Sequence, residues 1–280
     1  MGTTVITGGA GGMGLATAAI VGREQPVLLS DIDAERLDVA VARLRGDGID
    51  ATAMVCDITD RRQVEALFAR AREIGPVSAV VHAAGISPQM GAVEPIIRIN
   101  AVGTINVVRA GLAQAAPGFA LVNVASLAGH MLPKFLRPHR AYRWAAADPA
   151  VFVRKMTRAA NRAPLAARPG LAYSLSKHFV IWYSRTQAAA FGVEDARILS
   201  VSPGSFDTDM GRLEEESGSG RLIEHAALKR FGTPCEIAEL LAFCASGKAG
   251  YLTGVDILCD GGTKAGLDFR AILAMARNTR

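Results

Sequence analysis

The segment YSLSK at residues 173–177 places a phenol and an amine four residues apart. On a helix, that spacing stacks the side chains of Tyr173 and Lys177 on one face, one turn apart. A tyrosine in a free peptide has a pKa of about 10 and is rarely ionised at neutral pH, but a neighbouring lysine ammonium favours the phenolate. Such a pair can remove the proton of a secondary alcohol while hydride leaves for an oxidised nicotinamide. The same spacing also occurs on ordinary helix surfaces, so other segments have to distinguish the two interpretations.

A glycine-rich turn, TGGAGGMG at residues 7–14, follows the first β-branched run of the chain. Glycines allow a sharp turn and a close approach to a pyrophosphate, whose charge is met by the free N–H groups of a helix N-terminus. Gly8, Gly12 and Gly14 do not follow the plain GxGxxG spacing, and a tight strand-to-helix turn is the ordinary alternative. The position after the first strand and before a helix favours a dinucleotide site.

An acidic residue, Asp31, ends the second apolar run. A carboxylate there can accept hydrogen bonds from an adenosine ribose and would repel a 2′-phosphate. No lysine or arginine lies in the glycine turn or directly beside Asp31, so the sequence favours NAD over NADP. Asp31 could instead cap a helix, although Asp33 is the better candidate for a cap. For Asp57, at the end of the third run, a contact with the adenine and a helix cap are both open.

Short, nearly continuous apolar runs alternate with longer helical patterns. Such runs are typical of parallel strands covered on both faces. The alternation predicts an α/β fold, a single domain with a doubly wound, Rossmann-like parallel sheet of about seven strands. Strands are expected at 3–8, 26–31, 51–57, 78–84, 120–126, 197–203 and 255–260. Helices are expected at 13–22, 33–45, 61–73, 94–115, 172–191 and 234–245.

Residues 130–168 interrupt this alternation with a basic segment. We expect residues 1–262 to form the dinucleotide-binding and catalytic domain, with 130–168 as a helical insertion and 263–280 as a C-terminal tail. The insertion holds nine lysine and arginine side chains and one acid, a net charge of +8 against +5 for the whole chain. No nucleic-acid recognition motif accompanies this charge, so a nucleic-acid partner is not expected.

The second half of the insertion has an amphipathic helical pattern. Asp148 and Pro149 predict the helix cap and first helical position. The following residues would place Phe152, Met156 and Ala159 on one face and basic side chains on another. A solvated basic helix is one interpretation. The other is a cover over the active site, whose apolar face contacts a bulky substrate and whose arginines attract an anionic group.

The composition excludes several classes of protein. A chain of 280 residues with 50% hydrophobic residues can bury a substantial core. The run 4–22 is apolar but contains six glycines, which suit a turn better than a lipid-facing helix, so we expect no membrane span. We also expect no targeting signal and a cytoplasmic location. No CxxC or Cys/His cluster suggests a metal site, and we expect four reduced core cysteines, Cys56, Cys235, Cys244 and Cys259.

With these landmarks, the chain resembles the short-chain dehydrogenase/reductase family from Thr3 to Gly262. TGGAGGMG is similar to the cofactor loop TGxxxGxG, and HAAG at 82–85 is similar to a fourth-strand motif whose first residue is usually Asn. The remaining similar segments are Asn100 in INAVG, Ser126 in NVASLAG, YSLSK at 173–177, SPGSFDT at 202–208 and YLTGVDILCDGG at 251–262. Seven segments in the family's order make the resemblance specific.

The resemblance implies an NAD(H)-dependent oxidoreductase that interconverts a secondary alcohol and a ketone, with Tyr173 as general base or acid. Ser126 would hydrogen-bond the substrate oxygen as charge develops there. Lys177 would also hold the nicotinamide ribose, and Asn100 would support a water that relays the proton outward. The implied cofactor-binding residues are Gly8, Gly12, Met13, Gly14, Asp31, Ile32, Asp57, Ile58, Ala84, Gly85, Tyr173, Lys177, Pro203, Gly204, Phe206 and Thr208.

The chain departs from the family pattern at two places. Ser126 and Tyr173 are separated by 46 residues, far more than is usual, and the stretch from Gly85 to Asn100 is short. This pattern is similar to the branch containing bacterial 3-alpha-hydroxysteroid dehydrogenase/carbonyl reductase, which implies a hydroxysteroid or another bulky alcohol. The Tyr173 helix often builds the dimer interface in the family, so a homo-oligomer is implied, a dimer or tetramer whose assembly the insertion could alter. A non-catalytic NAD-sensing protein is the alternative, because fold alone does not determine function.

Overall fold

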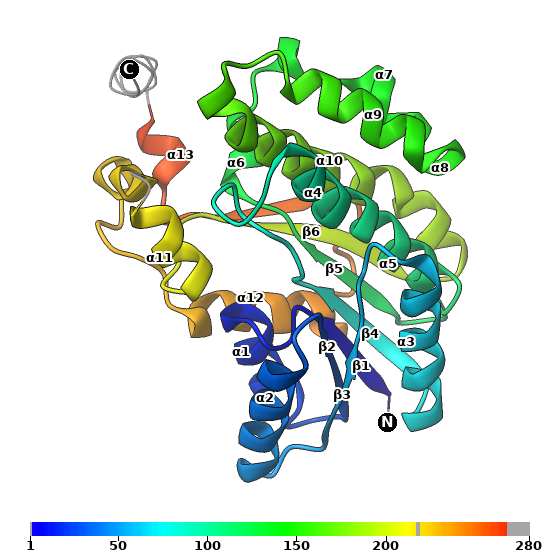
Figure 1. The fold of residues 1–280 in the computed structure, drawn as a ribbon. Helices are drawn as coiled ribbons and strands as arrows, with labels where there is room; N and C mark the ends of the chain where they lie inside the picture. The colour runs from blue at the N-terminus through cyan, green and yellow to red at the C-terminus, as the bar shows by residue number, and fades with distance from the viewer. Residues whose placement is uncertain (1, 217–218, 268–280) are drawn as a thin grey trace.

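The computed structural model describes residues 2–216 and 219–267 (Figure 1). Within these residues, strands and helices alternate as the sequence predicts. The strands are β1 Thr3–Thr7, β2 Val27–Asp31, β3 Ala51–Val55, β4 Val77–His82, β5 Ala120–Val124, β6 Arg197–Pro203 and β7 Asp256–Cys259. The helices that flank them are α1 Gly12–Val21, α2 Ala34–Gly46, α3 Arg61–Ile74, α4 Val93–Ile97, the π-helix η1 Arg98–Val102, α5 Gly103–Leu112, α10 Arg168–Val193 and α12 Pro234–Ala245.

The seven strands of the described chain form one parallel sheet in the order β3-β2-β1-β4-β5-β6-β7. The predicted doubly wound fold is therefore confirmed. The direction of winding reverses between β1 and β4, where Thr7 lies opposite His82. In open α/β sheets, ligands bind in the crevice at the carboxyl ends of the strands beside such a reversal. The topology thus places a crevice next to the glycine turn that follows β1.

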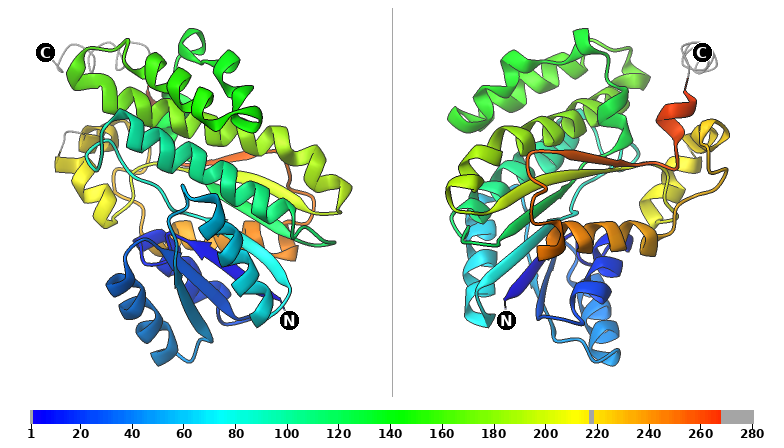
Figure 2. Two further views of the ribbon diagram at one scale, coloured as in Figure 1. Left: turned by 45° about the vertical axis from the view of Figure 1, so that its right-hand side comes forward. Right: turned by 180° about the vertical axis from the view of Figure 1, so that it is seen from behind.

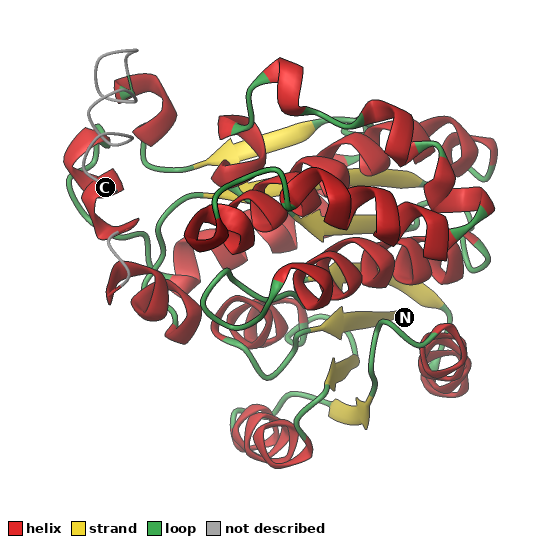
Figure 3. Cartoon of the chain, turned by 45° about the horizontal axis from the view of Figure 1, so that its top comes forward, coloured by secondary structure: helices red, strands yellow, loops and turns green. Residues whose placement is uncertain are grey.

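Helices cover both faces of the sheet (Figures 2 and 3). Helices α1, α2 and α12 lie on one face, and α3, α5 and α10 lie on the other. Successive strand residues point to opposite faces, so Val5 and Leu28 enter the core under α3 and α5, whereas Ile6 and Leu29 enter the core under α1 and α2. All four side chains are fully buried. This two-sided burial is why the strands read as continuous apolar runs.

The insertion adds a third layer outside α10 and α4 (Figure 2). As predicted, Asp148 caps its longest helix and accepts the Ala150 and Val151 N–H groups, both at 3.0 Å. Phe152 and Met156 are fully buried on the inner face, but Ala159 is only half-buried. Between β5 and α10 the elements are α6 Leu127–Met131, η2 Lys134–Leu136, α7 His139–Tyr142, α8 Trp144–Ala147, α9 Pro149–Ala160 and η3 Leu165–Ala167.

Some boundaries differ from the sequence prediction. Helix α10 begins at Arg168 rather than at 172, and the helix expected at 94–115 is interrupted by the π-helix η1. Cys56 and Cys244 are buried, but Cys235 is exposed, so the expectation of four core cysteines is wrong for that residue. The remaining elements are α11 Asp209–Glu216, η4 Ser219–His225, η5 Gly247–Ala249 and α13 Thr263–Gly266.

The part of the chain that the structure describes contains no helix with the length and apolarity needed to cross a membrane. The expected C-terminal tail at 263–280 begins with α13, and its residues 268–280 lie outside the described residues. All four cysteines are free thiols.

Candidate active site

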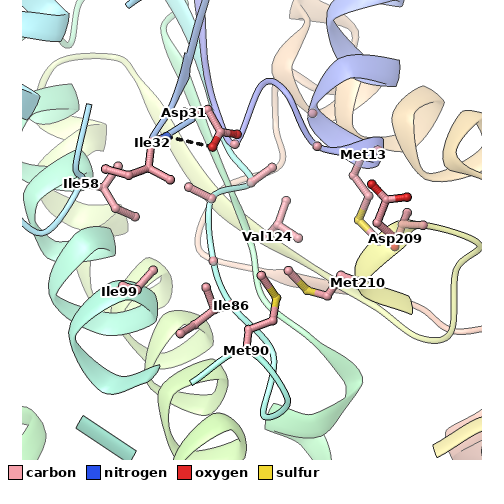
Figure 4. A pocket seen from close by; sticks show the side chains of 18 of the residues that line it. Met13, Asp31, Ile32, Ile58, Ile86, Met90, Ile99, Val124, Asp209 and Met210 are labelled. Carbon is pink, nitrogen blue, oxygen red and sulfur yellow. Dashed lines mark hydrogen bonds between the residues drawn. The ribbon is translucent and has the colours of Figure 1, made fainter. Parts of the chain in front are cut away.

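A cavity of about 680 Å³ opens at the carboxyl ends of the central strands. Figure 4 shows Asp31 and Ile32 at one end, Val124 in the middle, and Met90 with Met210 at the other end. Asn100 is the one predicted site residue that does not line it. The predicted residues on its wall are Gly8, Gly12, Met13, Gly14, Asp31, Ile32, Asp57, Ile58, Ala84, Gly85, Ser126, Tyr173, Lys177, Pro203, Gly204, Phe206 and Thr208.

The glycine turn keeps the backbone close to its neighbours at one wall of the cavity. Gly8 has a φ of 68°, and a Cβ there would lie 2.7 Å from the Ala84 nitrogen. A Cβ on Gly14 would collide with the Gly8 carbonyl, and one on Gly12 would lie 3.0 Å from the Thr208 methyl group. The turn leads into the ten-residue helix α1, whose N-terminus favours an anion. This cradle fits the pyrophosphate of a dinucleotide.

Asp31 lies with Ile32 at one end of the cavity (Figure 4). Its Oδ1 accepts the Ile32 N–H at 2.8 Å, which holds the carboxylate at the end of β2. Asp33, as predicted, caps α2 and accepts the Arg36 N–H at 3.0 Å. Asp31 therefore keeps an oxygen available for a ligand at this end of the cavity.

Asp57 lines the same end of the cavity beside Ile58. Its Oδ1 accepts the Thr59 N–H at 2.8 Å. Helix α3 is capped by Asp60, whose side chain accepts the Arg62 N–H, so the helix-cap interpretation of Asp57 is wrong. The other interpretation, a contact with an adenine, stays a prediction.

Another part of the wall brings together Tyr173 and Lys177 from α10 and Ser126 from the N-terminus of α6. Lys177, only 6% exposed, donates from Nζ to the Val124 carbonyl at 3.0 Å. Its Nζ lies 5.8 Å from the centre of the Tyr173 ring, as the spacing of one helical turn predicts. Ser126 follows β5 and its Oγ accepts the Ala128 N–H at 3.1 Å. Because that bond uses an oxygen lone pair, the Ser126 hydroxyl proton remains available for an acceptor in the cavity.

Asn100 lies behind the cavity wall and is 1% exposed. Its Oδ1 accepts the Ile86 N–H, and its Nδ2 donates to the Ile86 carbonyl, both at 2.9 Å. Nδ2 also lies 3.3 Å from the Ser176 hydroxyl on α10. The Asn100 side chain therefore ties the loop after β4 to the helix that carries Tyr173 and Lys177, and does not face the cavity.

Three charged residues of the cavity wall, Arg36, Arg98 and Asp209, were missed by the sequence analysis. Arg98 is paired with Glu94 at 2.8 Å on the adjoining helical turn. The Arg36 guanidinium lies 3.3 Å from the Asp209 carboxylate and 3.4 Å from the Ala10 carbonyl in the glycine turn. Both side chains are more than half exposed, so the pair adds little to stability. Arg36 lies in the first turn of α2, five residues after Asp31. A search by helical spacing, instead of among sequence neighbours alone, could have found it.

Apolar residues without a recognisable motif line the other end. Ile86 and Met90 come from the loop after β4, and Met210 and Leu213 come from α11. In Figure 4, the Met90 and Met210 side chains point toward each other across the cavity. Methionine is flexible and polarisable, so these walls suit an apolar ligand of irregular shape.

The insertion does not cover this cavity. Among the described residues, none of 130–168 lines it, because the apolar face of α9 packs on α10 and α4. The Phe152 ring lies 4.7 Å from the Phe179 ring, between centres. The expected substrate cover is therefore wrong. When α9 packs against two helices, its apolar face buries more surface than it would at the edge of an open cleft. Arg154, Lys155 and Arg158 are exposed on the outer face.

Within residues 2–216 and 219–267, no three His, Cys, Asp or Glu side chains lie together in a group that could hold a metal ion. The polar side chains at the cavity include hydroxyl, amine and carboxylate groups and the guanidinium groups of Arg36 and Arg98. Such groups can bind a dinucleotide and move a proton.

The fold and the cradle at the sheet reversal define a Rossmann-type dinucleotide-binding protein. A family model described as short chain dehydrogenase matches residues 2–148, and a model described as Enoyl-(Acyl carrier protein) reductase matches residues 155–264. The chain belongs to the short-chain dehydrogenase/reductase family, whose members are oxidoreductases that bind a nicotinamide cofactor.

Relatives and solved structures are similar over almost the whole chain. The short-chain dehydrogenase/reductase bsc3 of Alternaria brassicicola is 30% identical, over 94% of this chain and 96% of its own. The 3-oxoacyl-[acyl-carrier-protein] reductase FabG of Thermotoga maritima is 26% identical, over 92% and 96%. An actinorhodin polyketide ketoreductase solved with NADPH has a TM-score of 0.74 at 22% identity, over 94% and 97%. That likeness supports the fold.

Proposed function

We propose that the protein is an NAD(H)-dependent short-chain dehydrogenase/reductase that interconverts a secondary alcohol and a ketone by hydride transfer. The observation that carries the proposal is the position of Tyr173 and Lys177, one helical turn apart on the cavity wall with Ser126. The glycine cradle and Asp31 lie on other parts of the same wall. One cavity therefore offers both a place for a dinucleotide and groups that can handle an alcohol proton.

Each of the three polar residues has a separate chemical role in the proposal. The nicotinamide cofactor, when bound, accepts or supplies the hydride. Tyr173 takes the alcohol proton during oxidation and returns it during reduction. The Lys177 ammonium favours the phenolate form of Tyr173. Ser126 donates a hydrogen bond from its hydroxyl to the substrate oxygen, on which negative charge develops.

The other predicted site residues would hold the cofactor. Gly8, Gly12 and Gly14 would accommodate the pyrophosphate at the N-terminus of α1. Asp31 would accept hydrogen bonds from the adenosine ribose. The remaining proposed contacts are Met13, Ile32, Asp57, Ile58, Ala84, Gly85, Tyr173, Lys177, Pro203, Gly204, Phe206 and Thr208, all on the cavity wall.

We propose NAD as the preferred cofactor because a carboxylate occupies the end of β2. Arg36, a cation on the same wall, is paired with Asp209 at 3.3 Å. A 2′-phosphate would thus face the Asp31 charge while the guanidinium is engaged elsewhere. For the substrate we propose a bulky secondary alcohol or ketone, including hydroxysteroids, because Ile86, Met90, Met210 and Leu213 form apolar walls. A purely NAD-sensing protein would need none of the Ser126, Tyr173 and Lys177 side chains.

We also propose a homo-oligomer that functions in the cytoplasm. Four free thiols, including the exposed Cys235, suit a reducing compartment. Because α9 packs on α10 and α4, a dimer or tetramer would have to use other surfaces than those covered helix faces. Analytical ultracentrifugation of the purified protein tests the assembly, and a monomer at micromolar concentration would contradict it.

The test of the proposed activity is Tyr173→Phe, which removes only the phenolic oxygen. We expect turnover to fall at least a hundredfold, as is usual for loss of a general acid or base. NAD binding, measured by calorimetry, should survive because the cradle and Asp31 are unchanged. Tyr183→Phe is the control, since Tyr183 lies on the same helix but not on the cavity wall.

Turnover would be followed as NADH absorbance with a panel of secondary alcohols, sterols and hydroxyacyl thioesters. Retention of more than about a tenth of wild-type turnover by Tyr173→Phe would remove Tyr173 from the proton-transfer role. Absence of NADH formation by the wild-type protein with every substrate, despite NAD binding, would favour the sensing alternative.

A further inference from the structure

His82 lies at the end of β4, where the short-chain dehydrogenase/reductase family usually has asparagine. It is 2% exposed. Its Nδ1 lies 2.6 Å from the Thr7 hydroxyl, and its Nε2 lies 3.1 Å from the Thr104 hydroxyl. The Thr104 hydroxyl in turn donates to the Asn100 carbonyl at 2.7 Å. The four residues form a continuous buried hydrogen-bond chain from β1 to the π-helix η1.

The donor and acceptor in each of these hydrogen bonds follow from the last group in the series, the Asn100 carbonyl. The Asn100 carbonyl can only accept, so it takes the single proton of the Thr104 hydroxyl. Thr104 must then accept from the Nε2–H of His82, and Nδ1 is left to accept from Thr7. Burial, aided by the Lys177 charge, lowers the pKa of His82 to about 3. The ring therefore stays neutral, in the one tautomer that this chain of bonds requires.

This series of hydrogen bonds ends at Asn100, whose side chain contacts the elements that support the candidate active site. The Asn100 side chain holds Ile86 through two hydrogen bonds and lies 3.3 Å from Ser176, the residue before Lys177. A Cβ on Gly85 would lie 3.0 Å from the Asn100 Oδ1 and 3.4 Å from the Lys177 Nζ. The lysine ammonium thus packs against the same loop that Asn100 clamps. π-Helical turns such as η1 are often found at functional sites.

We propose that His82 and Thr104 are positioning residues, whose one-way hydrogen-bond chain from Thr7 fixes the Asn100 turn and thereby the Lys177 ammonium beside Tyr173. The inference rests on the proposed function, because Lys177 matters to turnover only if Tyr173 transfers a proton. It gives His82 a role in catalysis that its position in the sheet alone does not suggest. No proton passes along the chain, since the His82 ring keeps its tautomer.

A purely structural role would also satisfy these buried polar groups, so the test needs a matched control. Ser184 provides one on α10. Its hydroxyl is fully buried, lies 2.9 Å from the Asn123 Nδ2 and donates to the Val180 carbonyl at 2.9 Å. This is the same arrangement of a sheet side chain, a hydroxyl and a carbonyl four residues earlier. It lies two turns beyond Lys177 and away from the cavity wall.

The experiment measures kcat, KM for NAD and thermal stability from about pH 6 to pH 10, the range between ordinary histidine and tyrosine titration. The variants are Thr104→Val, which removes the hydroxyl at nearly constant volume, Thr104→Ser, which retains it, and the control Ser184→Ala. We expect Thr104→Val to shift the acid limb of the kcat-against-pH profile to a pH about one unit higher, because a displaced Lys177 ammonium favours the Tyr173 phenolate less. At a pH below that limb, kcat should be about tenfold lower than in the wild-type protein. Thr104→Ser should restore the profile, and KM for NAD should change less than twofold.

Ser184→Ala should lose stability but keep the wild-type kcat profile. A Thr104→Val protein that folds and keeps the wild-type profile at every pH would overturn the inference, while the proposed function would stand. If Thr104→Val does not fold, His82→Asn replaces it, because the shorter side chain breaks the contact with Thr104 and keeps a polar group. The same shift is expected there, and an unchanged profile would equally overturn the inference. A wild-type protein without NAD-dependent turnover would instead refute the proposed function.

Discussion

Replacing Asp31 with alanine should move the cofactor preference from NAD toward NADP. The Asp31 carboxylate is held at the end of β2 by the Ile32 N–H at 2.8 Å, and it is only partly exposed. Alanine removes both its charge and its acceptor oxygens. Arg36, on the same wall, can then attract a 2′-phosphate, although its 3.3 Å pair with Asp209 competes.

The size of the change follows from the charges. Two unit charges 4 Å apart interact by about 1 kcal/mol in water and about 4 kcal/mol at an effective dielectric constant near 20. For the partly exposed Asp31, a repulsion of about 2 kcal/mol is reasonable, so its removal should raise kcat/KM for NADP roughly thirtyfold. Loss of a hydrogen bond to a charged acceptor costs about 1.5 kcal/mol, so kcat/KM for NAD should fall roughly tenfold.

The assay compares kcat/KM for NAD and NADP in the wild-type protein, Asp31→Ala and the double variant Asp31→Ala/Arg36→Gln. The double variant should gain less for NADP, because it lacks the guanidinium. Asp38→Ala is the control, since Asp38 is exposed on α2, carries the same charge and is not on the cavity wall. Equal use of both cofactors by the wild-type protein, or an unchanged ratio in Asp31→Ala, would refute the reasoning.

Two further predictions concern the insertion and the buried histidine on α10. The first is that KM for an anionic substrate changes less than twofold, at low and at high salt, in the triple variant Arg154→Gln/Lys155→Gln/Arg158→Gln, since these exposed residues are outside the cavity wall. A larger rise in KM that depends on salt would contradict this. Burial first, then the Arg137 charge, lowers the pKa of His178 to about 4 from 6.5. Between pH 6.5 and pH 4, His178 is therefore protonated in the unfolded chain but neutral in the folded protein. The free energy of unfolding should fall as the pH drops through this range. Urea unfolding of wild type and His178→Gln measures this, and identical pH slopes would disprove it.

Local rules were sufficient for much of the molecule. Continuous apolar runs such as the one containing Val5 and Ile6 predict parallel strands, since each residue is buried on one face or the other. Asp33 and Asp148 predict helix caps because a cap depends on backbone groups two or three residues away. The Tyr173 and Lys177 spacing likewise depends on one helical turn. These features require only short-range geometry, so the sequence by itself determined them.

Only the tertiary structure decided which distant groups meet. The pattern of Phe152 and Met156 shows that one face of α9 is buried, but it does not say that α10 and α4, rather than the substrate cleft, bury it. Arg36 meets Asp209 across 173 residues of chain. His82 reaches Thr104 because β4 lies beside the helix that follows η1. Such partners depend on strand order and helix packing, which arise from the burial of the whole core. The local sequence around either residue therefore does not indicate its partner.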